Sequence, residues 1–352
     1  MGQGWQKWAK IAGAVLAGIV LLLIIVWVAM QRADIPYAKL EAKYGTAASR
    51  YVDLPGGIHM HYQDQGNPKG PTLVLVHGFF VNLDTWQPWV KRLGNDYRII
   101  TLDLPGHGLT RAPKGYHPSR SGYVQTLDDF VSAEHLGKFT LGGSSMGGDI
   151  AWRYAVAHGD KLNGLILVDA AGWPDPRPQG DQVKATKALS SPLGRFLATH
   201  LDATKKVREA MLLAYANPKF VTEEQVAKFT ELNRAPGHRA AIVDLATDGG
   251  KDGFATPDAL AAITVPTLIL EGDKDQLVPP VNASKFASAI KGSRLILYPG
   301  LGHVVQEEDP DKTAADVRAF LKSLQPAPKK PAAPTATKAS NAGRNPNTTI
   351  FY

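Results

Sequence analysis

The sequence of 352 residues contains no cysteine. This absence excludes a disulfide framework, a thiolate metal site and a cysteine nucleophile. It does not identify the cellular compartment, because a chain without thiols is compatible with either redox environment. Hydrophobic residues make up 44% of the chain and charged residues 20%, so the chain can bury a sizeable core. Wholesale disorder is therefore excluded.

Acidic residues are absent from both ends of the chain, and this absence accounts for the net charge of +7. Residues 1–32 carry three basic side chains, and residues 325–352 carry four. The stretch 33–324 is therefore neutral overall and has no excess of positive charge for binding a polyanion. A nucleic-acid partner is not expected.

Charged residues are also missing from the stretch 11–30, which reads IAGAVLAGIVLLLIIVWVAM. A helix of this length crosses the hydrocarbon core of a bilayer, which is about 30 Å thick. Trp5 and Trp8 precede the stretch and Trp27 lies near its far end, as in an aromatic belt. The alternatives are a buried core helix and a cleaved signal peptide, but a signal h-region is usually only about 7–15 residues long. We therefore predict a single-pass membrane anchor over residues 1–32 that binds the lipid bilayer.

The side of the membrane on which the rest of the chain lies is not determined by the sequence. Basic residues occur close to both ends of the apolar stretch in nearly equal number. Residues 33–48 are predicted to link the anchor to the folded body. At the other end, residues 325–352 are rich in proline, alanine, lysine and small polar residues, and we predict a disordered tail there.

Short apolar runs alternate with helical patterns through the rest of the chain. The predicted strands are 50–54, 58–64, 72–76, 98–102, 139–142, 164–169, 267–271 and 294–298. The first two flank a Pro-Gly-Gly turn and predict an antiparallel hairpin. Most later strands are continuous apolar runs, typical of parallel strands covered on both faces. Helical patterns fall at about 121–136, 146–158, 281–290 and 310–324, so the chain is predicted to form a mostly parallel, doubly wound α/β sheet.

The alternation stops over residues 173–260, where amphipathic stretches occur without a convincing strand. An insertion of this size with its own helices is a cap rather than a linker. The α/β core is therefore predicted over 49–172 and 261–324, with a helical cap at 173–260.

The segment 143–147 reads GSSMG and fits the pattern G-x-S-x-G between a predicted strand and a predicted helix. This pattern forms a sharp turn that exposes the central hydroxyl, and only very small residues fit two positions to either side. Ser145 has glycines at both of these positions, whereas Ser144 has Met146 on one side. Ser145 is therefore the predicted nucleophile.

A serine nucleophile needs a base and an acid that orients the base. Asp275 follows the seventh predicted strand and His303 follows the eighth, both at carboxyl ends of strands, where ligands bind in open α/β sheets. Asp275 is the predicted acid, and Asp169 at the end of the sixth strand is the alternative. Asp273 lies closer to its strand and is expected to shape the turn.

The tetrahedral intermediate needs two N–H donors. The backbone amide of Met146, at the start of a helix, is predicted to be one, and the amide of Phe79 in the loop after the third strand is predicted to be the other. His77 is expected to shape this loop. Phe80, Trp173 and Leu212 are the predicted substrate-binding residues, although aromatic and leucine side chains of a cap also serve as its own small core.

These segments together resemble the α/β-hydrolase superfamily over about residues 49–324. The resemblance rests on HGF at 77–79, DLPGHGLT at 103–110, GSSMG at 143–147, GDKDQLVP at 272–279 and GH at 302–303. Within the superfamily, the anchor, cap and GSSMGG turn resemble membrane-bound monoacylglycerol lipase-like and bacterial lipase or esterase members. Haloalkane dehalogenases and related epoxide hydrolases have an aspartate where this chain has Ser145. The resemblance implies a structural role for 103–110.

The expected activity is the hydrolysis of hydrophobic, lipid-derived carboxylic esters through an acyl-enzyme, with no metal and no organic cofactor. A carbon–carbon bond hydrolase of meta-cleavage-product type is the alternative, and it would need a cationic group near the pocket. A perhydrolase or aminopeptidase would use the same three residues. A catalytically silent binding module would lack part of the triad. The oligomeric state is not determined.

Overall fold

The computed structural model describes residues 2–177, 180–248 and 250–325. The predicted disordered tail lies outside the described residues except for its first position, Gln325.

Eight strands form one sheet in the order β1-β2-β4-β3-β5-β6-β7-β8. Their bounds are β1 Ser49–Leu54, β2 Ile58–Gly66, β3 Thr72–Val76, β4 Arg98–Leu102, β5 Phe139–Ser144, β6 Leu162–Val168, β7 Thr267–Gly272 and β8 Arg294–Tyr298. Strand β2 runs antiparallel to both of its neighbours, and β3 to β8 run parallel. This architecture confirms the predicted mostly parallel sheet, including the hairpin of β1 and β2 around the short 3-10 turn Pro55–Gly57.

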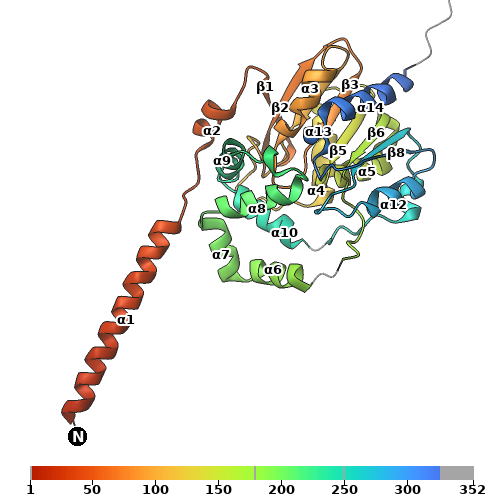
Figure 1. Cartoon of the computed structure of the whole chain (residues 1–352). Coiled ribbons are helices and arrows are strands. Elements are labelled where there is room, and N and C mark those ends of the chain that lie inside the picture. The colour runs from red at the N-terminus through yellow and green to blue at the C-terminus, as the bar shows by residue number, and fades with distance from the viewer. Residues whose placement is uncertain (1, 178–179, 249, 326–352) are drawn as a thin grey trace, which may run out of the picture.

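The central strands bury both of their faces, which explains their continuous apolar sequences. In β3, Leu73 and Leu75 face one hydrophobic cluster, while Val74 and Val76 face the other. Helices α3 (Gln87–Leu93) and α14 (Pro310–Ser323) cover the first face, and α4 (Arg120–Ala133), α5 (Met146–His158) and α12 (Val281–Ala289) cover the second. The sheet is therefore the middle layer of three, as Figure 1 shows.

Several helices lie between β6 and β7, where the strand–helix alternation of the sequence stops. They are α6 Gly180–Ser190, α7 Pro192–His200, α8 Thr204–Ala214, α9 Glu223–Leu232, α10 His238–Thr247 and α11 Pro257–Ala261. We call α6 to α10 the insertion helices. A short helix α13 (Val305–Glu308) follows β8. The insertion helices lie on one side of the body, on the side from which the N-terminal helix projects (Figure 1).

The N-terminal helix α1 (Gly2–Met30) projects away from the body (Figure 1). Within its segment Gly4–Met30, an 18-residue window has a mean hydropathy of 3.0, and none of that window is buried. Length and composition therefore make α1 a candidate membrane span, a property that a signal sequence shares.

The segment 33–48, which we expected to be a linker, contains helix α2 (Tyr37–Tyr44). Leu40 of α2 is only 1% exposed and packs with Leu109, Leu232 and Ala235. The Tyr37 hydroxyl lies 3.0 Å from Nε2 of the buried His238 in α10. This segment is thus attached to both the core and the insertion helices, and its short length and single buried leucine explain why no helical pattern stood out in the sequence.

Replacing Leu40 by alanine should lower the free energy of unfolding by about 2–5 kcal/mol, since it removes a buried leucine from a closed cluster. Denaturant unfolding of the full chain in detergent micelles measures this change. The matched control is Lys39→Ala on the exposed face of the same helix, which should cost little. Equal stability of the two variants would mean that the packing of α2 does not stabilise the fold.

Candidate active site

Ser145 lies in a sharp turn between β5 and α5, with backbone angles φ 55° and ψ −117°. A positive φ is costly for a residue with a side chain and persists where the surroundings enforce it. Its N–H donates to the carbonyl of Val168, and its own carbonyl accepts from the amides of Asp149 and Ala171. Strand β6 and helix α5 thus hold the strained turn from two sides.

The glycines around Ser145 are required by close backbone contacts. A Cβ added at Gly143 would lie 2.1 Å from the carbonyl oxygen of Gly147, and one at Gly147 would lie 2.2 Å from the carbonyl oxygen of Val76. Both distances are far below a van der Waals contact. The neighbours of Ser145 therefore have to be glycine, as the sequence pattern predicts.

Asp275 and His303 form a buried pair after β7 and β8. Oδ2 of Asp275 lies 2.6 Å from Nδ1 of His303, while Oδ1 accepts from the amides of Leu277 and Val278. Both side chains are at most 7% exposed. Because Asp275 accepts at Nδ1, the proton of a neutral imidazole lies there and Nε2 is free to act as a base.

The pKa of His303 is raised from its ordinary value. Burial by itself lowers it, but the charge and hydrogen bond of Asp275, together with the charge of Asp169, outweigh burial. The Asp275 carboxylate therefore increases the basicity of this histidine.

Two further acids lie behind this pair. One oxygen of each of Asp169, Glu271 and Asp275 lies within 4.8 Å of the others, and all three residues are buried. Burial, and then the nearby carboxylates, raise the pKa of Asp169 to about 8 and that of Glu271 to about 11. The sequence hinted at Glu271, since it is the charged residue in the apolar strand β7.

The alternative acid Asp169 is engaged elsewhere. Its Oδ1 accepts from the amide of Gly272 at 2.9 Å, and its Oδ2 accepts from the amide of Val305 at 3.3 Å. It has a positive φ of 46°. Asp169 thus joins the ends of β7 and α13, whereas Asp275 contacts the histidine. The oxygens of Asp169 and Asp275 are committed to N–H donors, so this cluster suits shared protons better than a cation. Asp273 accepts from the amide of Gly300 and shapes the turn.

The loop after β3 carries the predicted oxyanion donor Phe79. His77 donates from Nδ1 to the carbonyl of Gly78 at 2.7 Å, and its Nε2 accepts from the amide of Leu104 at 3.0 Å. Burial lowers the pKa of His77, so this side chain is neutral. Its two hydrogen bonds hold the loop in place. A Cβ on Gly78 would lie 3.1 Å from Cβ of Ser145, which shows how close this loop is to the turn.

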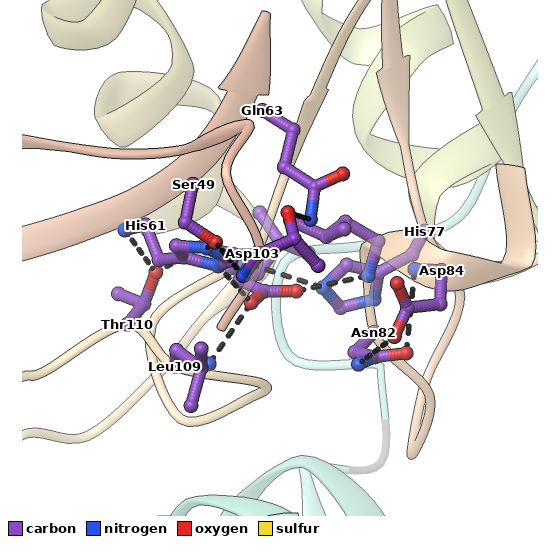
Figure 2. A network of polar contacts seen from close by, with 12 residues as sticks. Ser49, His61, Gln63, His77, Asn82, Asp84, Asp103, Leu109 and Thr110 are labelled. Carbon is purple, nitrogen blue, oxygen red and sulfur yellow. Dashed lines mark hydrogen bonds and ion pairs between the residues drawn. The ribbon is translucent and has the colours of Figure 1, made fainter. Parts of the chain in front are cut away.

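Asp103 organises the segment 103–110 beside this loop (Figure 2). Its carboxylate accepts from the amides of Leu83 and Leu109, and Oδ2 lies 2.7 Å from Nδ1 of His61. The Thr110 hydroxyl donates to the Asp103 carbonyl at 2.6 Å. These contacts are internal to the fold, and the segment therefore supports the His77 loop.

A cavity of about 790 Å³ opens at Ser145. Phe79, Met146 and the predicted pocket residue Trp173 line it. The other two predicted pocket residues lie elsewhere: Phe80 packs against the cluster of Val207 and Met211 in α8, and Leu212 is 41% exposed. Lining residues that the sequence did not single out include Val183, Leu245 and Phe254. They come from the insertion and the loop after it, so only the packing of that insertion on the core brings them to Ser145.

Residues 71–310 match the family described as the alpha/beta hydrolase fold. The chain belongs to this family. It is 29% identical over 277 residues to monoacylglycerol lipase abhd6-B of Xenopus laevis, covering 77% of this chain and 81% of that protein. It is 25% identical over 304 residues to 2-hydroxy-6-oxo-6-(2'-aminophenyl)hexa-2,4-dienoic acid hydrolase of Metapseudomonas resinovorans, covering 83% and 96%.

Solved structures agree on the fold of this hydrolase. A bacterial membrane phospholipase A superposes with a TM-score of 0.67 at 22% identity, covering 91% of this chain and 99% of that one. At this identity the similarity concerns the fold alone.

Replacing Asp275 by asparagine should lower kcat by about 10³–10⁴-fold. His303 then loses the acceptor that fixes its tautomer and the negative charge that stabilises its imidazolium form. The acid limb of the pH–rate profile should move to lower pH, since burial then dominates and lowers the pKa of His303. In the unchanged chain, activity should fall as the pH drops through a value above 6.5, where His303 gains a proton. Asp273→Asn is the matched control and should keep the profile. A larger loss in the control would assign the acid to Asp273.

Replacing Glu271 by glutamine should stabilise the protein at alkaline pH. The pKa of Glu271 is raised on folding to about 11, so this acid loses a proton on unfolding whenever the pH lies between about 4.5 and 11. Its contribution to the free energy of unfolding therefore falls by about 1.4 kcal/mol per pH unit in that window. Denaturant unfolding at pH 5 and pH 9 should show a gap between variant and parent that widens with pH. A constant gap would contradict a neutral Glu271.

Proposed function

We propose that this protein is a membrane-anchored serine hydrolase that cleaves carboxylic esters of hydrophobic, lipid-derived acids through an acyl-enzyme. The observation that carries the proposal is that Ser145, held in a strained turn, lines a cavity of about 790 Å³ with aromatic and aliphatic walls. The buried pair of Asp275 and His303 lies at the same edge of the sheet.

In this mechanism the Ser145 Oγ attacks the ester carbonyl while His303 Nε2 takes the hydroxyl proton. Asp275 stabilises the imidazolium that forms. The amides of Phe79 and Met146 donate to the oxyanion, and the dipole of α5 adds to this stabilisation because Met146 begins the helix.

Collapse of the tetrahedral intermediate expels the alcohol, which takes the proton from His303, and leaves the acyl group on Ser145. A water molecule then attacks the acyl-enzyme, and His303 accepts one of its protons. The second collapse releases the carboxylic acid and returns the proton to Ser145.

A hydrophobic acyl group is favoured by the lining of the cavity. Phe79, Trp173 and Phe254 contribute aromatic surface, and Val183 and Leu245 contribute aliphatic surface. Binding of an alkyl chain in such a cavity is favourable, because it removes apolar surface from water. The similarity to a monoacylglycerol lipase agrees with a substrate of this type. The insertion helices act as a cap that completes the pocket.

The carbon–carbon hydrolase is the second candidate, because Arg120, Arg153 and Lys187 also line the cavity. A diketo acid needs a cation for its carboxylate. However, Arg120 and Arg153 both bond to the buried Asp149, with Nε–O distances of 2.7 Å and 2.9 Å, and Arg120 also pairs with Asp248. Lys187 is exposed. The charges of the two arginines are thus largely compensated, which favours a neutral ester.

Retention of α1 as an anchor is supported by the way its last turn packs. Trp27 stacks on Phe196 of α7 with ring centroids 5.1 Å apart, and the Met30 carbonyl accepts from the amide of Asp202 at 3.0 Å. Cleavage after Ala29 would remove Trp27 from this contact. The anchor therefore joins the cap, which brings the pocket within reach of the bilayer.

The first test is hydrolysis of p-nitrophenyl esters from acetate to palmitate by the full chain in detergent micelles. We expect turnover that rises from short to medium acyl chains and disappears in Ser145→Ala. Ser144→Ala is the matched control and should retain activity. Turnover confined to acetate would contradict the lipid-derived substrate, and full activity of Ser145→Ala would contradict the nucleophile.

A second test fills the cavity. Ala246 lines it and is exposed, so Ala246→Phe adds a ring without disturbing the core. We expect kcat/KM for a dodecanoate ester to fall about tenfold or more, as loss of two buried methylenes would cause, with acetate hydrolysis nearly unchanged. Ala185→Phe, on an exposed position of α6 outside the cavity lining, is the control. An equal loss for both esters would mean that the cavity does not hold the acyl chain.

A further inference from the structure

A second cavity, of about 770 Å³, lies where α1 meets the insertion helices. It shares no lining residue with the Ser145 cavity. The charged side chains that line it are Arg32, Arg195, Arg239 and Asp34, and His200 lines it as well. The wall is therefore basic, although the body of the chain is neutral overall.

Each of these arginines also contacts an aspartate. Arg32 lies 3.0 Å from Asp202, and Arg195 pairs with Asp244. These two aspartates do not line the cavity. The pairing offsets part of the positive charge, and three arginines against one carboxylate line the space itself.

Arg239 is the most buried of the three arginines that line the space. Its side chain is only 10% exposed and pairs with Asp34 at 2.6 Å, yet its Nε has no hydrogen-bond partner among the described residues. An unsatisfied buried guanidinium donor is costly. Burial and the charges of Arg239 and Arg32 lower the pKa of the neighbouring Arg234, as expected where positive charge accumulates.

Helix α10 adds backbone donors to the same wall. It begins at His238; the preceding Gly237, and Arg239 and Ala240 of its first turn, line the cavity. The N-terminus of a helix attracts anions through free amides and the helix dipole. The opposing carbonyls at the end of α1 are already satisfied: Ala29 and Gln31 accept from Arg32, and Met30 accepts from Asp202.

The position of the cavity identifies the source of the anion. Val28 and residues 31–34 line it, so it lies at the point where the apolar helix ends and the polar chain begins. With α1 across a bilayer, this point is at the level of the lipid headgroups. We propose that the cavity binds the phosphate of an anionic phospholipid, held by Arg239, Arg195 and the N-terminus of α10. The inference rests on the proposed retention of α1, and ester hydrolysis is not needed for it.

Occupancy would couple the lipid to the active site. Arg195 belongs to α7 and Arg239 to the first turn of α10, whereas Leu245 and Ala246 near the end of α10 line the Ser145 cavity. A bound headgroup would therefore hold α7 and α10 together at the membrane surface, in the arrangement that forms the acyl pocket.

Native mass spectrometry of the full chain, released from detergent with equal amounts of dioleoyl-phosphatidylglycerol and dioleoyl-phosphatidylcholine, tests the proposal. We expect each chain to retain one molecule of phosphatidylglycerol in preference to phosphatidylcholine. Arg239→Gln and Arg195→Gln should each reduce the preference about fivefold, the effect of one basic residue near an anionic lipid. Arg195→Gln also separates lipid binding from anchor docking, since Arg195 pairs within the insertion, whereas Arg239 also donates to the Arg32 carbonyl.

Arg318→Gln is the matched control, because Arg318 likewise bonds one aspartate and one backbone carbonyl. Helix α14, which carries it, lies on the opposite side of the body from the insertion helices (Figure 1). It should keep the full preference. The proposal would be overturned if the unchanged chain retained the two lipids equally. It would also be overturned if Arg318→Gln lost the preference for phosphatidylglycerol as much as the two other variants. If 20 mM inorganic phosphate displaced phosphatidylglycerol, the cavity would be a site for free anions and the proposal would be overturned. If phosphatidylglycerol stayed bound in 20 mM phosphate, the proposal would be supported. The intact mass in the same spectrum reports a missing α1 directly, so failure of the anchor is distinguished from failure of the lipid site.

Discussion

The strained turn at Ser145 is the constraint on which the rest of the site depends. A residue with φ of 55° is held only if its neighbours leave no alternative, and here the backbone of β6 and the first turn of α5 bond to both sides of it. The same turn requires contacts between the backbones of Gly143 and Gly147 that no side chain would permit. The geometry that exposes the hydroxyl is therefore also the geometry that packs α5 onto the sheet.

Charge at the carboxyl edge of the sheet is arranged around this turn. Three acids are buried within a few ångströms of one another, a costly arrangement if all were ionised. Burial and the neighbouring carboxylates raise the pKa values of Asp169 and Glu271, and the hydrogen bond between Asp275 and His303 directs one carboxylate to the histidine. Burial thus distinguishes the acid that contacts His303 from two acids that hold their protons more tightly than usual.

Helix α1, the insertion helices and the Ser145 cavity form a connected series. Helix α1 packs on α7 through Trp27 and Phe196, while α10 contributes to both the basic cavity and the Ser145 cavity. Helix α2 fastens the intervening segment to the core through Leu40. Helix α1 is therefore attached to the part of the protein that lines the Ser145 cavity.

The sequence by itself determined the strands, the family and the turn at Ser145, because continuous apolar runs and paired glycines are local consequences of burial and close backbone contact. It predicted the candidate triad by order along the chain, and only the sheet order placed Asp275 rather than Asp169 against His303. The tertiary structure alone decided that residues 33–48 dock through Leu40, and that Phe80 and Leu212 lie away from the Ser145 cavity. It also brought Glu271 beside Asp169, and Arg195 and Arg239 beside the end of α1. These contacts join residues far apart in the chain, and no local pattern of polarity specifies which of them meet.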